Sequence, residues 1–268
     1  MEQITEQVIA TLSGSLPYLL HRPTVSDRAS DPALLLTFAT TARSAFQDKP
    51  HDIPFRHFAE AGHYVATFDL PHHGSCVDHF GEGIEGMCQA FVAGQDPFAR
   101  FIADGQAVID ACLTQGIGQN GKFVVCGVSR AGYCALRLAA SDPRIRGIAA
   151  LAPVTDWRRL REFAAVKEQP AVAALAIDNW AEQLVDRAVY LAIGNHDDRV
   201  GTDSFLRFAH RLFEAQDALN SSSPTLPASS GRMKQMHVID SPGHTLTDEW
   251  RSRGASFLLQ TISEIDNV

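Results

Sequence analysis

A serine stands between small residues in the segment KFVVCGVSRAGYCALRL, residues 122–138. The apolar, β-branched residues before Ser129 are typical of a buried strand, and the residues after it readily form a helix. A sharp turn between strand and helix forces the serine into strained backbone geometry and lifts its hydroxyl clear of the sheet. Gly127 and Ala131 are small enough for the place where strand and helix nearly touch. The segment therefore predicts a nucleophilic serine, with an ordinary turn that contains a serine as the alternative.

An aspartate and a histidine further along the chain are the partners that such a serine needs. A hydroxyl is a poor nucleophile unless a base takes its proton, and a histidine base works best when a carboxylate holds its ring. Asp197 follows an apolar run that ends at Ile193, and His244 follows one that ends near Ile239. Because loops at the carboxyl ends of parallel strands meet at one edge of a sheet, Ser129, Asp197 and His244 are expected to converge as a catalytic triad.

Strand and helix patterns alternate along the chain and predict the sheet that positions these residues. Apolar runs of strand length lie at residues 32–38, 63–69, 123–126, 146–151, 188–193 and 233–239. Segments with helical spacing of apolar side chains lie at residues 55–61, 98–112, 202–213 and 246–262. This alternation is typical of an α/β protein with a parallel sheet.

Five other segments fit this repeat less closely. Residues 1–12 carry apolar side chains at helical spacing and are expected to form a short helix on the sheet edge, and residues 18–21 a short strand. Residues 75–97 are rich in glycine and aperiodic, which predicts a long surface loop with room for one short helix. Residues 154–187 are a mostly helical insert, too small for a cap with a core of its own. Residues 221–231 have the composition of a loop.

Composition and charge exclude several classes of function. The chain has 268 residues, 45% of them hydrophobic and 20% charged, and no repeat or linker divides it, so a single α/β domain over residues 1–268 is expected. A net charge of −8 without a basic cluster argues against nucleic acid or an anionic membrane as the main partner. No apolar run approaches the ~20 residues of a membrane span. The first residues lack the features of a secretory signal, so the sequence predicts a soluble, cytoplasmic protein.

The cysteines and histidines do not form a metal-binding or disulfide pattern. Five cysteines are an odd number, and none belongs to a C-x-x-C pair, so reduced thiols in the core are expected. His72, His73, Asp78 and His79 could in principle ligate a metal, but their spacing is irregular. No metal and no cofactor is therefore predicted.

Four segments together resemble the α/β-hydrolase superfamily: GVSRAG around Ser129, DLPHHG from Asp69, GNHDDRV from Gly194 and SPGHT from Ser241. The resemblance covers nearly the whole chain from about Leu34, and it is strongest to the esterase and prolyl-oligopeptidase-like branch, without a propeller domain. It implies an α/β-hydrolase fold: a mostly parallel central sheet, helices on both faces and no large cap domain. It also implies hydrolysis of an ester, thioester or amide through an acyl-enzyme.

The resemblance also selects the acid of the triad. In the family pattern the acid stands three residues after a glycine and three before an apolar residue, which is the place of Asp197 between Gly194 and Val200. Its neighbour Asp198 and the more distant Asp156 remain as alternatives.

Further site residues follow from the same resemblance. The tetrahedral intermediate needs two N–H donors, and the first should be the backbone amide of Arg130. The family's usual His-Gly after the first buried strand is absent, and alignment assigns the second donor to Ala39, with Thr40 as the alternative. Thr40, His72 and His73 are candidate pocket-lining residues, although a structural role is the alternative for the histidines. The Arg130 side chain could reach an anionic group of a substrate or form a surface ion pair.

The predicted function is that of a serine hydrolase, a carboxylesterase that acts on a small-molecule ester with a small or medium acyl group. An amidase or peptidase of the same mechanism is the nearest alternative, and a non-catalytic binding protein on the same fold is another. A dehalogenase would need aspartate, and a dienelactone-type enzyme cysteine, in place of Ser129. A second copy of the chain is a candidate partner.

Overall fold

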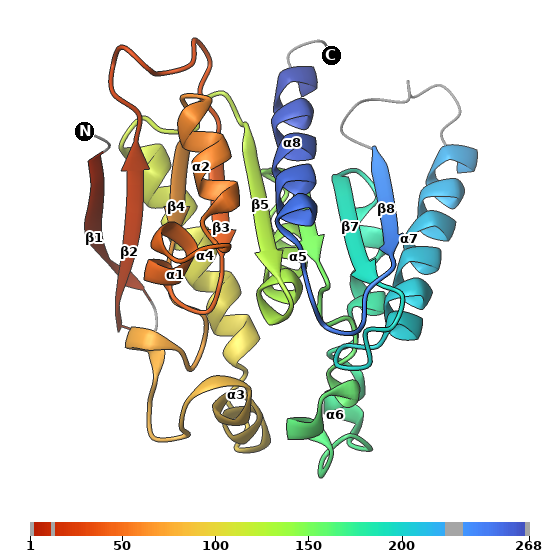
Figure 1. Ribbon diagram of the computed structural model, residues 1–268. Helices are drawn as coiled ribbons and strands as arrows, with labels where there is room; N and C mark the ends of the chain where they lie inside the picture. Colours follow the sequence, from red (N-terminus) through yellow and green to blue (C-terminus); the bar gives the residue numbers. More distant parts are fainter. Residues whose placement is uncertain (1–2, 12–13, 223–232, 266–268) are drawn as a thin grey trace.

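An eight-stranded sheet forms the centre of the computed structural model, which describes residues 3–11, 14–222 and 233–265 (Figure 1). The strands lie side by side in the order β1-β2-β4-β3-β5-β6-β7-β8. Their bounds are β1 Gln3–Thr11, β2 Gly14–Arg22, β3 Leu34–Phe38, β4 Tyr64–Thr67, β5 Phe123–Val128, β6 Ile145–Leu151, β7 Ala188–Gly194 and β8 Lys234–Ile239.

The six strands β3 to β8 run parallel to one another. Strand β2 pairs antiparallel with β4, and β1 pairs antiparallel with β2 at the edge of the sheet. Every residue of β3, β4 and β7 is buried, which is why these segments read as unbroken apolar runs rather than as alternating ones. The prediction of an α/β protein with a mostly parallel sheet is confirmed.

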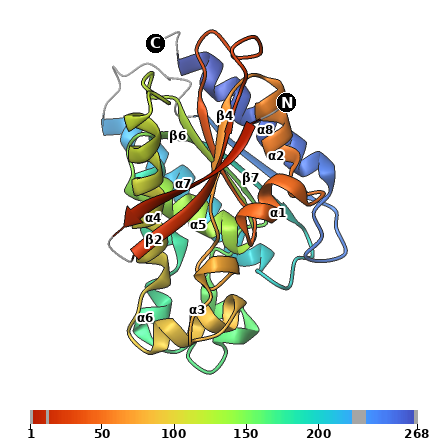
Figure 2. The ribbon, with the colours of Figure 1, turned by 90° about the vertical axis from the view of Figure 1, so that its left-hand side faces the viewer.

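Helices cover both faces of the sheet, as Figure 2 shows. One face carries α1 Ala42–Gln47, α2 Ile53–Glu60 and α8 Asp248–Glu264, and the other carries α4 Pro97–Thr114, α5 Arg130–Ser141 and α7 Thr202–Ser222. Because side chains of a strand alternate between faces, Leu34 and Leu36 of β3 lie in the core under α4 and α5, and Leu35 lies in the core under α1 and α2. Burying each such side chain contributes about 1.5–3 kcal/mol.

The predicted helix over residues 1–12 is wrong, because residues 3–11 form the edge strand β1. Its antiparallel pairing with β2 runs from Gln3 opposite Arg22 to Thr11 opposite Gly14. The apolar spacing fits a helix, but β-branched Ile4, Thr5, Val8 and Ile9 prefer a strand. The hairpin with β2 also extends the predicted short strand over residues 18–21 to nine residues, Gly14–Arg22.

Two connections at the carboxyl ends of the strands contain helices. The segment predicted as a long loop with room for one short helix over residues 75–97 holds the 3-10 helix η1 Gly74–Cys76 and the ten-residue helix α3 Gly83–Val92. Two glycines inside α3 hide its helical pattern, but burial of its apolar face stabilises it.

The connection between β6 and β7 is a chain of short helices. They are η2 Trp157–Arg159, η3 Arg161–Phe163, α6 Pro170–Ala173, η4 Ile177–Trp180 and η5 Glu182–Leu184. Trp157, Phe163 and Leu184 are fully buried in the main core, so this insert packs onto the sheet layer instead of enclosing a core of its own. Both α3 and α6 lie at the lower end of the molecule in Figure 1, the end to which β5 and β7 point.

The remaining sequence expectations concern the chain near its end and its cysteines. The predicted loop over residues 221–231 starts inside α7, which ends at Ser222, and its other residues lie outside the described ranges. All five cysteines are free thiols, and burial raises the pKa of Cys126 and Cys134 to about 12. Within residues 3–11, 14–222 and 233–265, no helix is both long and apolar enough to cross a membrane.

The two-sided burial of β3 predicts a large loss of stability when one of its leucines is truncated. Leu36→Ala is expected to lower the free energy of unfolding by about 2–5 kcal/mol, because the cavity left in the core cannot be filled. Urea unfolding followed by circular dichroism measures this change. The control Val25→Ala, at a side chain that is 87% exposed, should change it by less than about 0.5 kcal/mol. Equal losses in both variants would contradict the described burial.

Candidate active site

Ser129 stands at the turn between β5 and α5 with a backbone conformation that few residues adopt. Its φ of 57° and ψ of −122° lie outside the favourable regions for an L-residue, at a cost of about 1–3 kcal/mol. Three backbone hydrogen bonds hold it there: its N–H donates to the Leu151 carbonyl (2.8 Å), and its carbonyl accepts from Val154 (3.1 Å) and Tyr133 (3.2 Å). The neighbouring strand β6 thus stabilises the strained turn.

Small residues are required around Ser129 because strand and helix touch there. A Cβ atom added to Gly127 would lie 2.3 Å from the Ala131 carbonyl oxygen, so no larger residue fits at position 127. A Cβ atom on Gly132 would lie 3.1 Å from Cβ of Pro153. The methyl group of Ala131 is buried without such a conflict. The alanine at the last position of the G-x-S-x-G pattern is therefore compatible with the turn.

The structure brings Ser129, His244 and Asp197 into one hydrogen-bonded line. His244 Nε2 lies 3.0 Å from Ser129 Oγ, and His244 Nδ1 lies 2.7 Å from Asp197 Oδ2. A carboxylate only accepts hydrogen bonds, so Nδ1–H donates to Asp197 and Nε2 is left to accept from the serine hydroxyl. The three residues follow β5, β7 and β8, the strands whose carboxyl ends meet at this edge of the sheet.

The Asp197 carboxylate is buried and fixed by its own loop. Its Oδ1 accepts from the backbone N–H groups of Arg199 (3.1 Å) and Val200 (3.2 Å), which leaves Oδ2 for His244. Its own N–H donates to Thr202 Oγ1 (3.1 Å), and that hydroxyl donates to the Gly194 carbonyl (2.6 Å). The turn after β7 thus aims one carboxylate oxygen at the imidazole ring.

The two alternative acids lie elsewhere. Asp198 is exposed to solvent. Asp156 is buried, and its oxygens accept from Arg158 (2.6 and 2.8 Å) and Arg207 (3.2 Å). Burial acts to raise the pKa of Asp156, but the hydrogen bonds from Arg158 outweigh it and hold this pKa below its usual range. Neither carboxylate contacts His244.

A cavity of about 430 Å³ opens beside the Ser129 hydroxyl. Its walls come from the loop after β3, the turn before α2, the β5–α5 turn, the loop before α8 and the first turn of α8. The lining residues are Ala39, Thr40, His51, Val128, Ser129, Arg130, His244, Thr245, Leu246 and Arg251. In the part of the chain that the structure describes, the backbone N–H groups of Ala39, Thr40 and Arg130 donate no hydrogen bond, which makes them candidate donors to a ligand oxygen.

His51 and Arg251 line this cavity although no motif in the sequence points to them. Burial, with the nearby Arg251 charge, lowers the pKa of His51. Arg251 is 5% exposed, its Nη1 donates to the carbonyls of Leu246 (3.1 Å) and Thr247 (3.2 Å), and burial lowers its pKa. One signal was present: Arg251 stands four residues before Ala255 on the buried stripe of α8, where a charged residue needs a reason.

His73 contacts the residue after the serine. Its Nδ1 lies 2.8 Å from the Pro71 carbonyl oxygen, an acceptor, so Nδ1 carries the proton and Nε2 accepts from Arg130 Nε at 3.1 Å. Burial lowers the pKa of His73 more strongly than the bond to Pro71 raises it, which favours the neutral ring. His73 thus holds Arg130 in place rather than lining the cavity itself.

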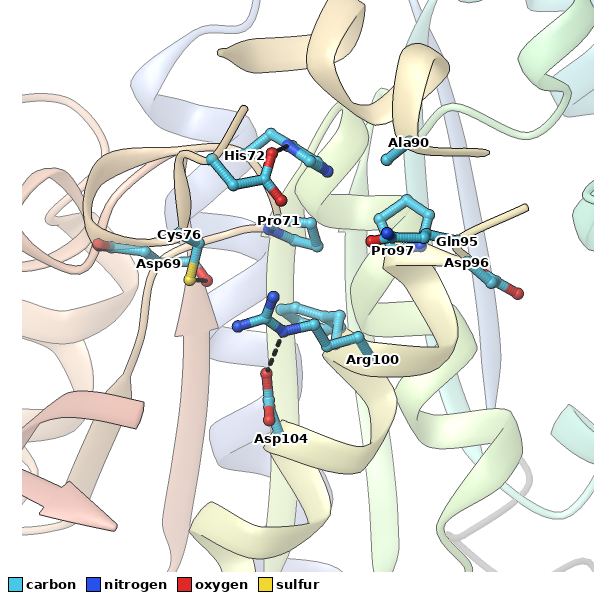
Figure 3. A pocket seen from close by; sticks show the side chains of 12 residues that line it. Asp69, Pro71, His72, Cys76, Ala90, Gln95, Asp96, Pro97, Arg100 and Asp104 are labelled. Atoms are coloured by element: carbon cyan, nitrogen blue, oxygen red, sulfur yellow. Dashed lines mark hydrogen bonds and ion pairs between the residues drawn. The ribbon is translucent and has the colours of Figure 1, made fainter. Parts of the chain in front are cut away.

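His72 belongs to a different cavity, shown in Figure 3, of about 50 Å³. Asp69, Cys76 and Arg100 line it as well, and Arg100 Nε lies 3.7 Å from Asp104 Oδ2. His72 Nδ1 lies 3.2 Å from Asp78 Oδ1. Among the described residues, no three His, Cys, Asp or Glu side chains form a group that could hold a metal ion.

The contact between Gly127 and Ala131 gives a test of the turn. Gly127→Ala is expected to lower the free energy of unfolding by about 1–3 kcal/mol, because the new methyl group overlaps a backbone carbonyl that cannot move freely. Urea unfolding checks it. The control Ala131→Gly keeps the backbone carbonyl of residue 131 and adds no atom to the contact, so it should cost only about 1 kcal/mol, the helix propensity lost with the methyl group. A Gly127→Ala protein as stable as the wild type would refute the described geometry.

Comparisons with known proteins agree with this fold. The model of the alpha/beta hydrolase family matches residues 37–265. An esterase of Pyrococcus furiosus superposes with a TM-score of 0.64 at 18% identity, over 97% of this chain and 91% of that one. A putative dienelactone hydrolase from Klebsiella pneumoniae superposes with a TM-score of 0.67 at 14% sequence identity, over 98% of this chain and 99% of that one.

A larger protein contains the same fold as one of its parts. A putative dipeptidyl aminopeptidase IV from Bacteroides ovatus superposes with a TM-score of 0.65 at 14% identity, and this chain spans 36% of it. None of the curated proteins compared with the sequence matches it. The family match over most of the chain, together with the sheet order and the strand-turn-helix at Ser129, confirms the predicted fold: the chain belongs to the alpha/beta hydrolase family.

Proposed function

We propose that this protein is a serine hydrolase that cleaves a small or medium carboxylic ester through an acyl-enzyme. The observation that carries the proposal is the hydrogen-bonded line of Ser129, His244 and Asp197 beside an open cavity. A nucleophile within reach of a base, which is in turn oriented by a third group, is the arrangement that acyl transfer requires.

In the first half of the reaction, Ser129 Oγ attacks the ester carbonyl while His244 Nε2 takes the hydroxyl proton. Asp197 keeps the proton of His244 on Nδ1 and stabilises the imidazolium that forms. The imidazolium then protonates the leaving alcohol, and the acyl group stays on Ser129 as an ester. In the second half, His244 takes a proton from water, the hydroxide attacks the acyl-enzyme, and the free acid leaves as Ser129 regains its proton.

The negative charge that develops on the carbonyl oxygen needs N–H donors already in place. The Arg130 amide, at the N-terminus of α5, and the amide of Ala39 or Thr40 across the cavity are the candidate donors. Each such donor typically raises kcat by a factor of about 10²–10³. The start of α5 adds a favourable helix dipole at the same place.

An ester is favoured over a peptide as substrate on the ground of size. The esterase of Pyrococcus furiosus has nearly the length of this chain, whereas the aminopeptidase-like protein is much longer. A cavity of about 430 Å³ suits a small molecule. A non-catalytic binding protein would not need His244 aligned with both Ser129 and Asp197.

Removal of the nucleophile tests the proposal directly. Ser129→Ala is expected to lose labelling by a fluorophosphonate and to lower kcat/KM for p-nitrophenyl esters by about 10⁴-fold or more. The control Ser15→Ala, at an exposed serine of β2, should label and turn over as the wild type does. A panel of acyl chain lengths, run beside aminopeptidase substrates, separates esterase from peptidase activity. A folded wild-type protein that neither labels nor hydrolyses any substrate would refute a catalytic role.

Adjacent aspartates give a matched pair for the acid. Asp197→Asn is expected to lower kcat by about 10⁴-fold, because an amide can donate to His244 and place its proton on the wrong nitrogen. Asp198→Asn removes the same charge one residue away, at an exposed side chain, and should change kcat less than two-fold. Steady-state hydrolysis of one p-nitrophenyl ester gives kcat for both variants. Equal losses of kcat in the two variants would contradict the role of Asp197.

A further inference from the structure

Arg130 is a half-buried residue that lines the cavity, and its guanidinium has no carboxylate partner among the described residues. Its Nε donates to His73 Nε2, a neutral acceptor that fixes the side chain without balancing its charge. Other arginines near this edge of the sheet are paired: Arg158 with Asp156, Arg207 with Asp178, and Arg199 with Glu162. A desolvated, unpaired guanidinium is costly, so its retention needs a cause.

The acid whose charge acts on Arg130 is already occupied. The charge of Glu162 acts to raise the pKa of Arg130 but is outweighed by burial, and both Glu162 oxygens accept from Arg199, at 2.8 and 2.9 Å. Burial is the dominant effect and lowers the pKa of Arg130. The surface ion pair considered for Arg130 from the sequence is therefore absent from the described chain.

The two terminal nitrogens of Arg130 are available to a ligand. Nη1 and Nη2 donate no hydrogen bond within residues 3–11, 14–222 and 233–265, and neither is sealed off from solvent. The bond from Nε to His73 fixes the plane of the guanidinium and leaves the opposite edge free. A planar fork of this kind matches the two oxygens of a carboxylate.

A second guanidinium reinforces the positive potential of the cavity. Arg251 lines the same cavity, is 5% exposed, and has a buried Nε with no hydrogen-bond partner. No Asp or Glu is among the cavity's lining residues. The chain as a whole carries a net charge of −8, so the accumulation of two arginines beside Ser129 runs against the overall charge. Such a cavity concentrates anions.

We propose that the substrate is an ester that retains one free carboxylate, and that the Nη1 and Nη2 groups of Arg130 bind this carboxylate in a two-point pair while Ser129 attacks the ester carbonyl. Arg251, which lines the same cavity, adds to the attraction of this carboxylate. Half-esters of dicarboxylic acids and esters of hydroxy acids are the chemical classes that fit. The proposal rests on the proposed hydrolase function and names its substrate class.

Matched ester pairs test this proposal at pH 7.5. Mono-p-nitrophenyl glutarate and p-nitrophenyl pentanoate differ by a carboxylate on the acyl side, and 4-carboxyphenyl and 4-carbamoylphenyl butyrate differ on the alcohol side. The wild type is expected to prefer the anionic member of at least one pair by about ten-fold or more in kcat/KM. Equal kcat/KM values within both pairs would overturn the proposal.

Variants at Arg130 test whether this residue causes the preference for the anionic ester. Arg130→Met should bring the ratio of the two kcat/KM values close to one, and Arg130→Lys should retain part of it, since a lysine keeps the charge but not the fork. The control Arg43→Met removes an equal charge from an exposed site on α1 and should retain the full ratio. An Arg130→Met protein with an unchanged ratio would also overturn the proposal.

A binding measurement separates this proposal from the hydrolase proposal. In Ser129→Ala, which cannot form an acyl-enzyme, monomethyl glutarate should bind by calorimetry about ten-fold or more tightly than to the same protein with Arg130→Met. If the protein is labelled by a fluorophosphonate and hydrolyses neutral esters but shows no preference for anionic ones, only the carboxylate proposal is refuted.

If the protein binds the anion through Arg130 but is neither labelled nor active, the hydrolase proposal is refuted and a carboxylate-binding site remains. Binding that is the same with and without Arg130 would refute the site.

Discussion

The contact between the backbone of Gly127 and the carbonyl of Ala131 determines where the candidate nucleophile stands. Strand β5 ends at Val128 and helix α5 begins at Arg130, so Ser129 alone makes the turn between them, in a conformation that an unconstrained chain would avoid. The strain persists because hydrogen bonds to Leu151 and Val154 tie the turn to the strand and loop beside it. The Ser129 hydroxyl is thus placed by the sheet and helix rather than by a long loop.

The other two members of the line depend on the same sheet. Asp197 and His244 follow β7 and β8, strands that pair directly with one another and through β6 with β5. Their loops are held by local hydrogen bonds, such as those of Thr202 with Asp197 and Gly194. A shift of one residue in the register of β7 or β8 would move a side chain to the other face of the sheet and break the line. Core packing on both faces therefore serves the geometry of the site.

The sequence predicted those parts that depend on local pattern and chain order. Buried strands, the turn at Ser129 and the order of Ser129, Asp197 and His244 could all be read from apolar runs and the residues that follow them. The edge strand β1 could not, because its apolar spacing fits a helix and its strand form depends on pairing with β2. Helix α3 was hidden for a related reason, since its stability comes from burial and not from its own residues.

Residues that reach the cavity from unrelated segments were the least predictable. His51 and Arg251 belong to no motif and arrive there only through the packing of α2 and α8 on the sheet. His72 and His73 are neighbours in sequence, yet His72, with its positive φ, lines the small cavity of Figure 3, whereas His73 accepts a hydrogen bond from Arg130. The role of His73 is visible only in three dimensions, where its protonated Nδ1 faces a carbonyl and its Nε2 must accept from Arg130.

This bond links the charge of the cavity to its chemistry. A histidine that accepts from Arg130 Nε orients the guanidinium but leaves its charge unbalanced, whereas an aspartate in its place would neutralise it. The arginine follows the serine directly, so the amide that can stabilise the oxyanion and the guanidinium that can hold a second anionic group belong to one residue. Any displacement of the turn would move both together. Recognition of an anionic substrate and stabilisation of its transition state would then depend on the same backbone geometry that places Ser129.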